Sequence, residues 1–181
     1  MTLVDELRQM VGASQIEYSI GSESYWSDTQ IQRVLDSNRS LVDFEPIEWH
    51  PARIAGGSIE YKRATVNVGL ALVAGTAGGT IQESTGDVVT GWTLSRDGWI
   101  DFSTDQGSTG LHFSGWAYDM NSAAAQMCDA WAAGVKGLVD VTSDDQSLKL
   151  SQKVQSLKSL ARDFRAKAPM KQGMMTRGDA L

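Results

Sequence analysis

Glycines, histidines, acidic residues and one cysteine are the residues here with a capacity for chemistry. The stretch 74–86 contains four glycines, as a phosphate-binding loop would. Such a loop needs Gly-x4-Gly-Lys followed by Ser or Thr, because the lysine and the hydroxyl must reach phosphate and magnesium. No lysine lies between Arg63 and Lys136, and the dinucleotide-binding glycine pattern is also absent. We therefore expect residues 74–86 to form a flexible loop or the tip of a long hairpin.

The histidines and the acidic run at 140–145 do not match metal-binding patterns. His50 and His112 have no HxH, HExxH or cysteine partner, so we expect surface or hydrogen-bonded side chains. The acidic run is similar to the start of a calcium loop. However, Asp145 occupies the position of the loop glycine and Ser151 that of the final glutamate. The sequence predicts no metal site.

A catalytic nucleophile is also missing from the pattern. No serine, cysteine or lysine can be paired with a base and an orienting residue from the sequence. Cys128 lies in an alanine-rich helical pattern, where a small buried side chain is the usual role of cysteine. We predict that the protein is not an enzyme and uses no cofactor.

Charge is distributed unevenly along the chain. Residues 146–181 contain eight Lys and Arg and two Asp, a net charge of +6, so the other 145 residues carry −12 of the total of −6. A basic end on an acidic body suggests a nucleic-acid patch, a contact with the acidic surface of a second copy, or a solvated helix face. The net charge of −6 and the lack of a recognisable reading helix argue against a DNA-binding protein.

Length and composition are those of a single domain with its own core. A chain of 181 residues buries enough surface to fold without a metal or disulfide, and one cysteine cannot form an internal disulfide. The N-terminus has early acidic residues and no long apolar run, so we expect no signal peptide and no membrane span. These features predict synthesis in the cytoplasm.

Two short helices are predicted near the N-terminus. Thr2 and an acid three residues later suggest a capped helix over 2–11, stopped by Gly12. Ser27 and Gln30 form a capping-box pattern that begins a second helix over 27–38. Helices of this length are marginal alone, so both must dock on a larger body.

The middle of the chain, about 41–118, predicts a β-rich insert. The segment 59–71 is compatible with both a strand and a helix, because its apolar residues fit either spacing. The clearest hairpin is 92–102, which turns at Asp97 and Gly98. We expect the aromatic residues of this region on paired strands, in core or interface packing: Trp92, Trp99, Phe102, Phe113 and Trp116.

Two longer helices are predicted in the last third. The first covers 120–137 and is capped by Asp119 or Asn121. Residues 138–150 then suggest a small hairpin that turns at 143–145. Ser151 is expected to cap the last helix, 151–168, before a C-terminal tail at 169–181. The predicted fold class is α+β: one domain, 1–168, in which a small helical bundle contains an inserted β-hairpin or sheet region between its early and late helices.

The stretch 115–168 has a distinctive order of features. It begins GWAYDMNSAAA, continues through a Trp-bearing helix and a short polar hairpin, and closes with a helix that opens SQK and ends LARDFRAKA. This combination resembles the head-to-tail adaptor (connector or neck) proteins of long-tailed bacteriophages, in which a Tyr-Asp-Leu-x-x-Ala-Ala-like helix start and a Ser-Gln-Lys helix ending near Tyr-Arg recur. Met120 replaces the leucine and Phe164 the tyrosine.

The resemblance implies a structural virion protein that forms a dodecameric ring beneath the portal and extends the DNA channel. Its partners would be other copies of itself, the portal protein, and stopper or tail proteins, with genomic DNA passing through the lumen without specific binding. The protein would be located in the neck of the virion, assembled in the host cytoplasm and independent of membranes. An acidic body and a basic end suit both a head-to-tail ring contact and a lumen that repels phosphates.

By analogy with the family, the basic region after Phe164 would reach the portal or a neighbouring subunit, and loops 75–86 and 103–110 would contact the tail side. Candidate portal or neighbour contacts are Arg162, Arg165, Lys167, Lys171 and Arg177. Candidate tail-side loop residues are Gly78, Gly79, Asp105 and Gln106. The residues of the fold motif are Tyr118, Asp119, Trp131 and Ser151.

Two alternatives remain open from the sequence. A head-completion stopper or a tail terminator would differ from an adaptor in its order of assembly. A carbohydrate-binding module would use Trp92, Trp99 and Trp116 as stacking platforms for sugar rings.

Overall fold

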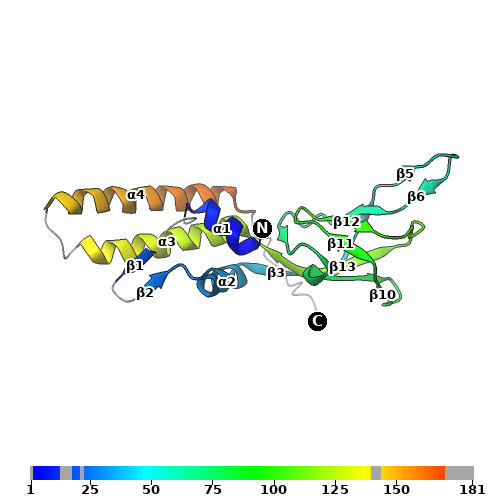
Figure 1. The fold of residues 1–181 in the computed structure, drawn as a ribbon, viewed down its shortest axis with the longest axis horizontal. Helices are drawn as coiled ribbons and strands as arrows, with labels where there is room; N and C mark the ends of the chain where they lie inside the picture. The colour runs from blue at the N-terminus through cyan, green and yellow to red at the C-terminus, as the bar shows by residue number, and fades with distance from the viewer. Residues whose placement is uncertain (1, 13–17, 21–22, 140–143, 170–181) are drawn as a thin grey trace, which may run out of the picture.

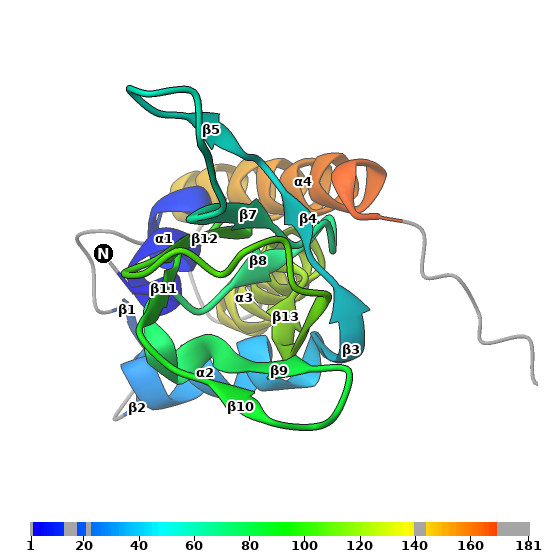
Figure 2. The same ribbon diagram turned by 90° about the vertical axis from the view of Figure 1, so that its right-hand side faces the viewer.

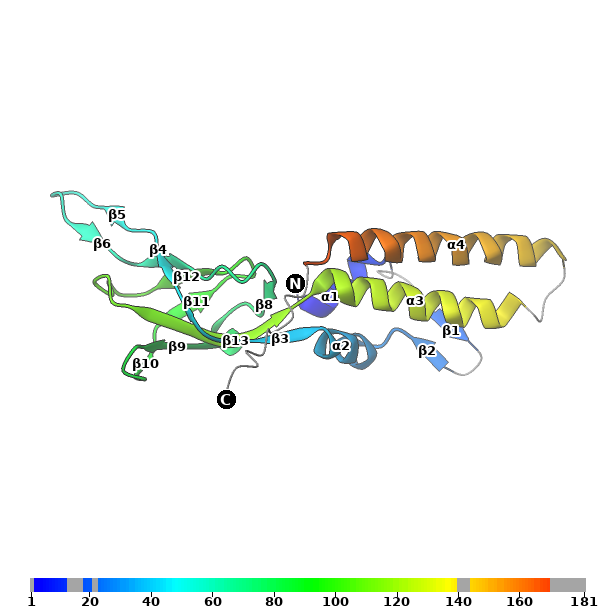
Figure 3. The ribbon, with the colours of Figure 1, turned by 180° about the vertical axis from the view of Figure 1, so that it is seen from behind.

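The protein is elongated, with helices at one end and strands at the other (Figure 1). The structure, a computed structural model, describes residues 2–12, 18–20, 23–139 and 144–169. The view from behind shows the same two halves, joined in the middle by β3 (Arg39–Pro46) and β13 (Leu111–Tyr118) (Figure 3). The predicted α+β class, with a β-rich insert between early and late helices, is confirmed.

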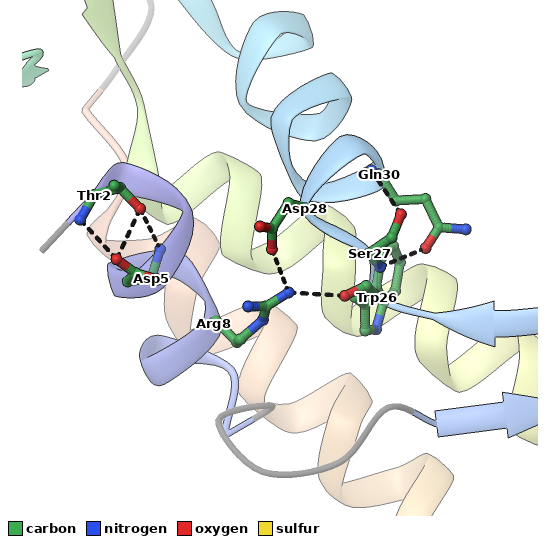
Figure 4. Close-up of polar contacts among 7 residues, drawn as sticks. All are labelled: Thr2, Asp5, Arg8, Trp26, Ser27, Asp28 and Gln30. Carbon is green, nitrogen blue, oxygen red and sulfur yellow. Dashed lines mark hydrogen bonds and ion pairs between the residues drawn. The ribbon is translucent and has the colours of Figure 1, made fainter.

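Two short helices begin where the sequence places capping boxes. In α1 (Leu3–Met10), the Thr2 hydroxyl accepts the N–H of Asp5, whose carboxylate accepts the N–H of Thr2 at 2.8 Å (Figure 4). In α2 (Asp28–Ser37), Ser27 and Gln30 exchange the same pair of bonds. Each cap satisfies N–H groups that have no partner within the helix.

One arginine joins these two helices. The Nη2 atom of Arg8 donates to the carbonyl of Trp26 at 3.0 Å and to Oδ1 of Asp28 at 2.7 Å (Figure 4). Because Trp26 and Asp28 lie on either side of the Ser27 cap, this contact fixes α1 against the start of α2. Leu7 of α1 and Ile31 of α2 also belong to the core that contains the larger helical pair, so both short helices dock on it, as their length requires.

The larger pair is α3 (Met120–Val139) and α4 (Asp144–Lys167), which lie side by side along the long axis (Figure 1). Ala124 on α3 and Ala161 on α4 are fully buried, and small side chains of this kind let helices approach closely. The core of the helical half contains these residues: Leu7, Val11, Ile31, Leu35, Tyr118, Met120, Ala123, Ala124, Ala125, Met127, Cys128, Ala132, Leu157, Ala161 and Phe164.

The hairpin predicted at 138–150 is wrong within the described residues. Helix α3 continues to Val139 and α4 begins at Asp144, so Ser151 lies inside α4 and does not cap it. Residues 140–143 are outside the described part. Leu150 precedes Val154, Leu157 and Ala161 at helical spacing, and this longer apolar period prevails over the short alternation that suggested strands.

The β half is built from two sheets. The larger has the order β10-β9-β13-β3, with β8 also paired to β13, and the smaller has the order β11-β12-β7-β4. A further pair, β5-β6, projects beyond them, and β1-β2 forms a separate pair near the helices (Figure 2). Beyond β3 and β13, the strands are β1 (Tyr18–Ile20), β2 (Glu23–Tyr25), β4 (Glu48–Trp49), β5 (Ala52–Arg53), β6 (Ile59–Glu60), β7 (Arg63–Thr65), β8 (Ala71–Leu72), β9 (Gly79–Glu83), β10 (Val88–Val89), β11 (Trp92–Leu94) and β12 (Trp99–Phe102).

The structure decides the segment that the sequence left open between helix and strand. Residues 59–71 contain β6, β7 and the start of β8, and Ala64 of β7 is fully buried between its exposed neighbour Arg63 and the half-buried Thr65. The hairpin predicted at 92–102 is confirmed, with Trp92 opposite Phe102 and the turn made by Gly98 at φ +86°.

Of the two alternatives predicted for 74–86, the flexible loop is wrong, and the hairpin tip applies only to the last residues, where the turn between β9 and β10 lies. Residues 79–83 form β9, which pairs with the central strand β13, and a short 3-10 turn precedes it at Thr76–Gly78. Gly78 and Gly79 serve close packing: a Cβ on Gly78 would lie 2.0 Å from the Val73 carbonyl oxygen, and one on Gly79 would lie 2.6 Å from the Phe113 ring. Lack of a side chain therefore allows the strands to approach each other.

The two sheets share one hydrophobic core, which is distinct from the helical core. Its buried members are Ile47, Ala64, Val66, Leu72, Ile81, Trp92, Leu94, Ile100, Phe102, Leu111, Phe113 and Ala117. The cores meet at β13, where Ala117 belongs to the β core and Tyr118 to the helical core. The span 1–168, predicted as one domain, thus contains two hydrophobic clusters along one axis. In the described part of the chain no helix is long and apolar enough to cross a membrane.

Candidate interaction surfaces

A hydrogen-bonded junction holds the two halves together. Asp119, between β13 and α3, accepts the N–H of Ser122 at 2.9 Å and its hydroxyl at 2.5 Å, which makes it the cap of α3. Its own N–H donates to the carbonyl of Asn38, the residue between α2 and β3, at 2.9 Å. The Asn38 amide in turn donates to Gln126 of α3 at 2.7 Å. Both chain crossings between the halves are therefore tied to one another, and Asp119 has a structural role.

A pocket of about 410 Å³ lies beside this junction. An ion pair between Glu6 of α1 and Arg96 of the β11–β12 turn lies on its wall and connects the two halves. The carboxylate of Asp119, also on the wall, is engaged by Ser122. Glu6 and Arg96 are thus paired with each other, and Asp119 is bound by Ser122. Because these charged groups already have partners within the fold, we assign the pocket to the packing of the junction.

Strand β3 forms the long edge of the larger sheet. Leu41 is 61% exposed and lies directly opposite Trp116, which is 40% exposed, on β13. The guanidinium of Arg39 lies 4.2 Å from the centre of the Trp116 ring. Directly opposed residues of paired strands lie on the same face, so these side chains form one exposed apolar patch.

The middle of β3 contains a bulge. Phe44 has φ +53°, a conformation that a bulky residue rarely adopts, and the pairing register with β13 shifts opposite it. Its N–H donates to the Ser114 hydroxyl at 3.0 Å, and its ring stacks on His112 with centroids 4.0 Å apart. These contacts hold the Phe44 ring at the surface, where it is 43% exposed.

The β5–β6 pair is a second exposed feature, and it extends away from the rest of the strands (Figures 1 and 2). Its turn is closed by the Ile54 N–H, which donates to the Ser58 carbonyl at 3.0 Å. Ile54 and Ile59 are both exposed beside this turn. A projecting hairpin with exposed isoleucines is suited to contact with another protein surface.

The basic residues proposed as portal or neighbour contacts lie on α4 as far as they are described. Arg162, Arg165 and Lys167 are exposed, and Arg165 forms an ion pair with Asp129 of α3. The carbonyl of Lys167 accepts the Asn121 amide at 3.3 Å. The remaining two candidates, Lys171 and Arg177, lie outside the described residues.

The four candidate tail-side residues do not share one environment. Gly78 is buried and Gly79 is half-buried within the β half, so the sequence-based placement of both at a loop tip is incorrect. Asp105 accepts the N–H of Tyr61 at 2.9 Å and that of Gly107 at 3.1 Å, and these bonds lower its pKa. In the same turn, the Gln106 side-chain amide donates to the Thr104 carbonyl, and the Gln106 carbonyl accepts the Thr109 hydroxyl.

The three tryptophans of the carbohydrate hypothesis lie in different environments. Trp92 is buried, and its indole N–H donates to a backbone carbonyl. Trp99 is in the smaller sheet with the Arg63 guanidinium 4.6 Å from its ring centre, whereas Trp116 is in the larger sheet beneath Arg39. The rings do not make a common stacking platform, so the arrangement gives that hypothesis no support.

The other side chains that could take part in catalysis or ligand binding are engaged in structural contacts. The His50 ring nitrogen Nε2 lies 2.9 Å from the Thr65 hydroxyl, and His112 stacks on Phe44. Cys128 is buried in the helical core, and burial raises the pKa of its thiol to about 11, which keeps it protonated. Trp131 is half-buried on α3, with the ammonium group of Lys153 4.9 Å from its ring centre.

Sequence reasoning missed the exposed edge of β3. The pattern of 39–46 shows alternation but gives no sign of whether a strand has one neighbour or two. A weak signal was present in the charges, because acidic side chains within a strand are typical of edges. Comparison of the chain with protein-family models, curated proteins and solved structures finds no match.

Proposed function

We propose that this protein is a head-to-tail adaptor of a long-tailed bacteriophage, a structural subunit whose ring lies beneath the portal and connects the capsid to the tail. The sequence resemblance over 115–168 is the starting point. In the fold, the described residues of this stretch form the end of β13, the Asp119 cap, and the helices α3 and α4.

The observation that carries the proposal is the division of the molecule into two separately cored ends along one axis. A connecting subunit must offer different surfaces to two neighbours. Here the helical end carries the basic residues of α4, and the β end carries the exposed apolar side chains. Enzymes, in contrast, bring polar groups together in one pocket.

The charge distribution agrees with a conduit for DNA. Among the described residues of the β half, Asp87 and Asp97 are exposed carboxylates without a described ion pair and lie away from β3. Negative charge facing a channel repels phosphates and allows the genome to pass without being held. Under the proposal, the basic region of α4 and the residues after it face the portal or a neighbouring subunit.

The test is assembly on capsids. Purified protein should sediment with capsids that contain the portal but no neck proteins, and electron microscopy should show a ring below the portal. Infection without this protein should yield DNA-filled heads that lack tails. Deleting residues 169–181 should weaken attachment, and unchanged attachment would remove the role proposed for that segment.

The order of addition separates an adaptor from a stopper or tail terminator. An adaptor binds portal-bearing capsids alone, whereas a stopper needs the adaptor first and a terminator binds tails. A protein that remains monomeric, does not bind these capsids and forms no ring in the virion would refute the proposal.

A further inference from the structure

The edge strand β3 presents an apolar surface that no described part of the chain covers. Leu41 and Trp116 are exposed cross-strand neighbours, and Phe44 is exposed two residues before Pro46. Strand β3 pairs with β13 on one side, and no described strand pairs with its other side. An exposed edge of this length is a binding surface unless it is blocked.

The geometry of β3 restricts what can bind there. The bulge at Phe44 interrupts the regular ladder, and Pro46 has no N–H to donate. A long added strand would therefore lose hydrogen bonds in the middle of the edge. A helix forms its backbone hydrogen bonds internally, so it does not need to pair with the free N–H and C=O groups of β3. Its side chains can pack against Leu41 and Phe44.

The charges beside these apolar residues are acidic. Asp43 and Glu45 lie on β3 and Glu48 follows on β4, and none of the three has an ion-pair partner among the described residues. The occupant that fits is a helix that carries unneutralised basic side chains with long alkyl stems.

Helix α4 of the same chain has this character. Lys158 and Arg162 are exposed, four residues apart on one face, and neither forms an ion pair within the part of the chain that the structure describes. Like charges at this spacing repel each other in an isolated helix. Arg165, one turn further along this face, forms an ion pair with Asp129. On this face of α4, Lys158 and Arg162 are therefore the basic side chains that a partner could neutralise.

One molecule does not bring these two surfaces together. Helix α4 forms the upper edge of the helical half in Figures 1 and 3, whereas β3 runs along the lower side of the join. We propose that the β3 edge of one copy binds the exposed face of α4 of a second copy, with Asp43 and Glu45 opposite Lys158 and Arg162. This inference rests on the proposed ring and identifies its subunit contact. Two different faces meet in it, so the contact repeats head to tail, as a closed ring requires.

An edge-to-edge contact between sheets is disfavoured by charge. The other edge of the larger sheet is β10, which is only two residues long and is flanked by Asp87, with Glu83 on the neighbouring β9. Pairing β10 with β3 of another copy would place these carboxylates near Asp43 and Glu45. The α4 face is therefore the better match.

Charge reversal on either surface tests the contact. We expect Lys158→Glu with Arg162→Glu, or Asp43→Lys with Glu45→Lys, to weaken self-association at least tenfold, measured by sedimentation velocity free in solution and on portal-bearing capsids. Controls reverse exposed charges elsewhere: Arg33→Glu on α2, and Asp87→Lys with Asp97→Lys. These controls should assemble like the wild type.

Mixing the two interface variants should restore assembly, because the acidic β3 of the first meets the basic α4 of the second and the reverse pair also matches. Native mass spectrometry should then show the two chains in equal numbers. This rescue also excludes misfolding as the cause of the single defects.

The outcomes separate this inference from the proposed function. Wild-type rings together with unimpaired interface variants would overturn the β3–α4 contact and leave the adaptor role intact. Variants that self-associate normally but no longer bind capsids would assign the surface to the portal and would also overturn it. A wild-type protein that is monomeric both free and on capsids would overturn the adaptor role itself.

Discussion

The helical half and the β half differ in what they leave exposed. Where the burial of side chains is described (2–12, 26–135 and 151–169), the six exposed large hydrophobic residues all lie in the β half: Leu41, Phe44, Ile54, Ile59, Val88 and Trp116. In the same ranges the helices bury or half-bury their large apolar side chains and expose charges. Because exposed apolar patches mark binding surfaces, the β half offers apolar contact to a partner, whereas the helical half offers charged contact.

The two cores also differ in construction. The helical core is rich in alanine, and most of its contacts join helices that are neighbours in sequence. The β core contains bulky side chains such as Phe113, Ile81 and Ile100, which come from strands far apart in the chain. A defect in one core should therefore reduce stability mainly in its own half. The following predictions test that separation, from the largest expected effect to the smallest.

Phe113→Ala should have the largest effect. Phe113 is fully buried at the centre of the larger sheet, and removing such a ring costs about 3–5 kcal/mol. Hydrogen exchange should show loss of protection in β9, β12 and β13, with α3 and α4 affected less. Val88→Ala, at an exposed position of the same sheet, should change stability by no more than about 0.5 kcal/mol. Equal loss of protection in both halves would mean that they unfold as one unit.

Ala161→Leu tests the helical core by adding side-chain volume instead of removing it. Ala161 is fully buried where α4 meets α3, and an added side chain there should cost about 1–3 kcal/mol by overpacking. Urea denaturation followed by circular dichroism should show the loss. Ala133→Leu, on the exposed face of α3, serves as the control and should have little effect. If both substitutions cost the same, close packing of α3 and α4 is not what alanine provides.

Asp119→Ala removes the cap at the junction. We expect a loss of about 0.5–2 kcal/mol, with faster hydrogen exchange in the first turn of α3, because the Ser122 N–H loses its acceptor. Asp119→Asn retains an acceptor oxygen and should recover most of the stability. An alanine variant as stable as the wild type would show that the Asn38 contacts alone hold the junction.

Two carboxylates, one in each half, predict a small dependence on pH. Hydrogen bonds from Thr2 lower the pKa of Asp5, and those from the Tyr61 and Gly107 N–H groups lower the pKa of Asp105, both from an ordinary value of 3.8. Because the folded-state pKa is the lower one, each carboxylate stabilises the fold above pH 3.8, and this contribution is lost as the pH falls through the folded value.

The matched variants Asp5→Ala and Asp105→Ala should each flatten the acid limb of the stability curve slightly. Thermal unfolding from pH 2 to pH 6 measures the effect. If the halves are separate, Asp5→Ala should act on helical protection and Asp105→Ala on protection around Tyr61. An unchanged acid limb in both variants would contradict the role of these hydrogen bonds.

The same contrast explains which parts of the fold were predictable. The starts of α1, α2 and α3 follow from local signals, since a cap and the first turn that it serves lie within four residues of each other. The hairpin 92–102 is equally local. Helix α4 begins at 144, seven residues before the predicted start at 151, because its helical period prevails over the short alternation that suggests a hairpin.

Features that depend on distant strands could not be predicted. Gly78 and Gly79 indicate flexibility by composition, and only the approach of Val73 and Phe113 shows that they serve packing. The surface around Leu41 is exposed because no strand of the described residues lies beyond β3, which is a property of the whole sheet. Of the candidate contacts, the exposed bases of α4 could be predicted from helical spacing, whereas their proposed acidic counterpart on β3 could not.

Strand β13 passes into α3 through a single residue and runs along the long axis of the molecule beside β3 (Figure 1). At the helical end of the ladder Arg39 of β3 pairs with Tyr118 of β13, and at the other end Pro46 pairs with His112. A pull between the two ends of the molecule would therefore stretch both strands in the same direction, and two covalent backbones would share the load without sliding past each other. This geometry should make the subunit stiff under tension along its axis, a useful property in a protein proposed to link a tail to a head.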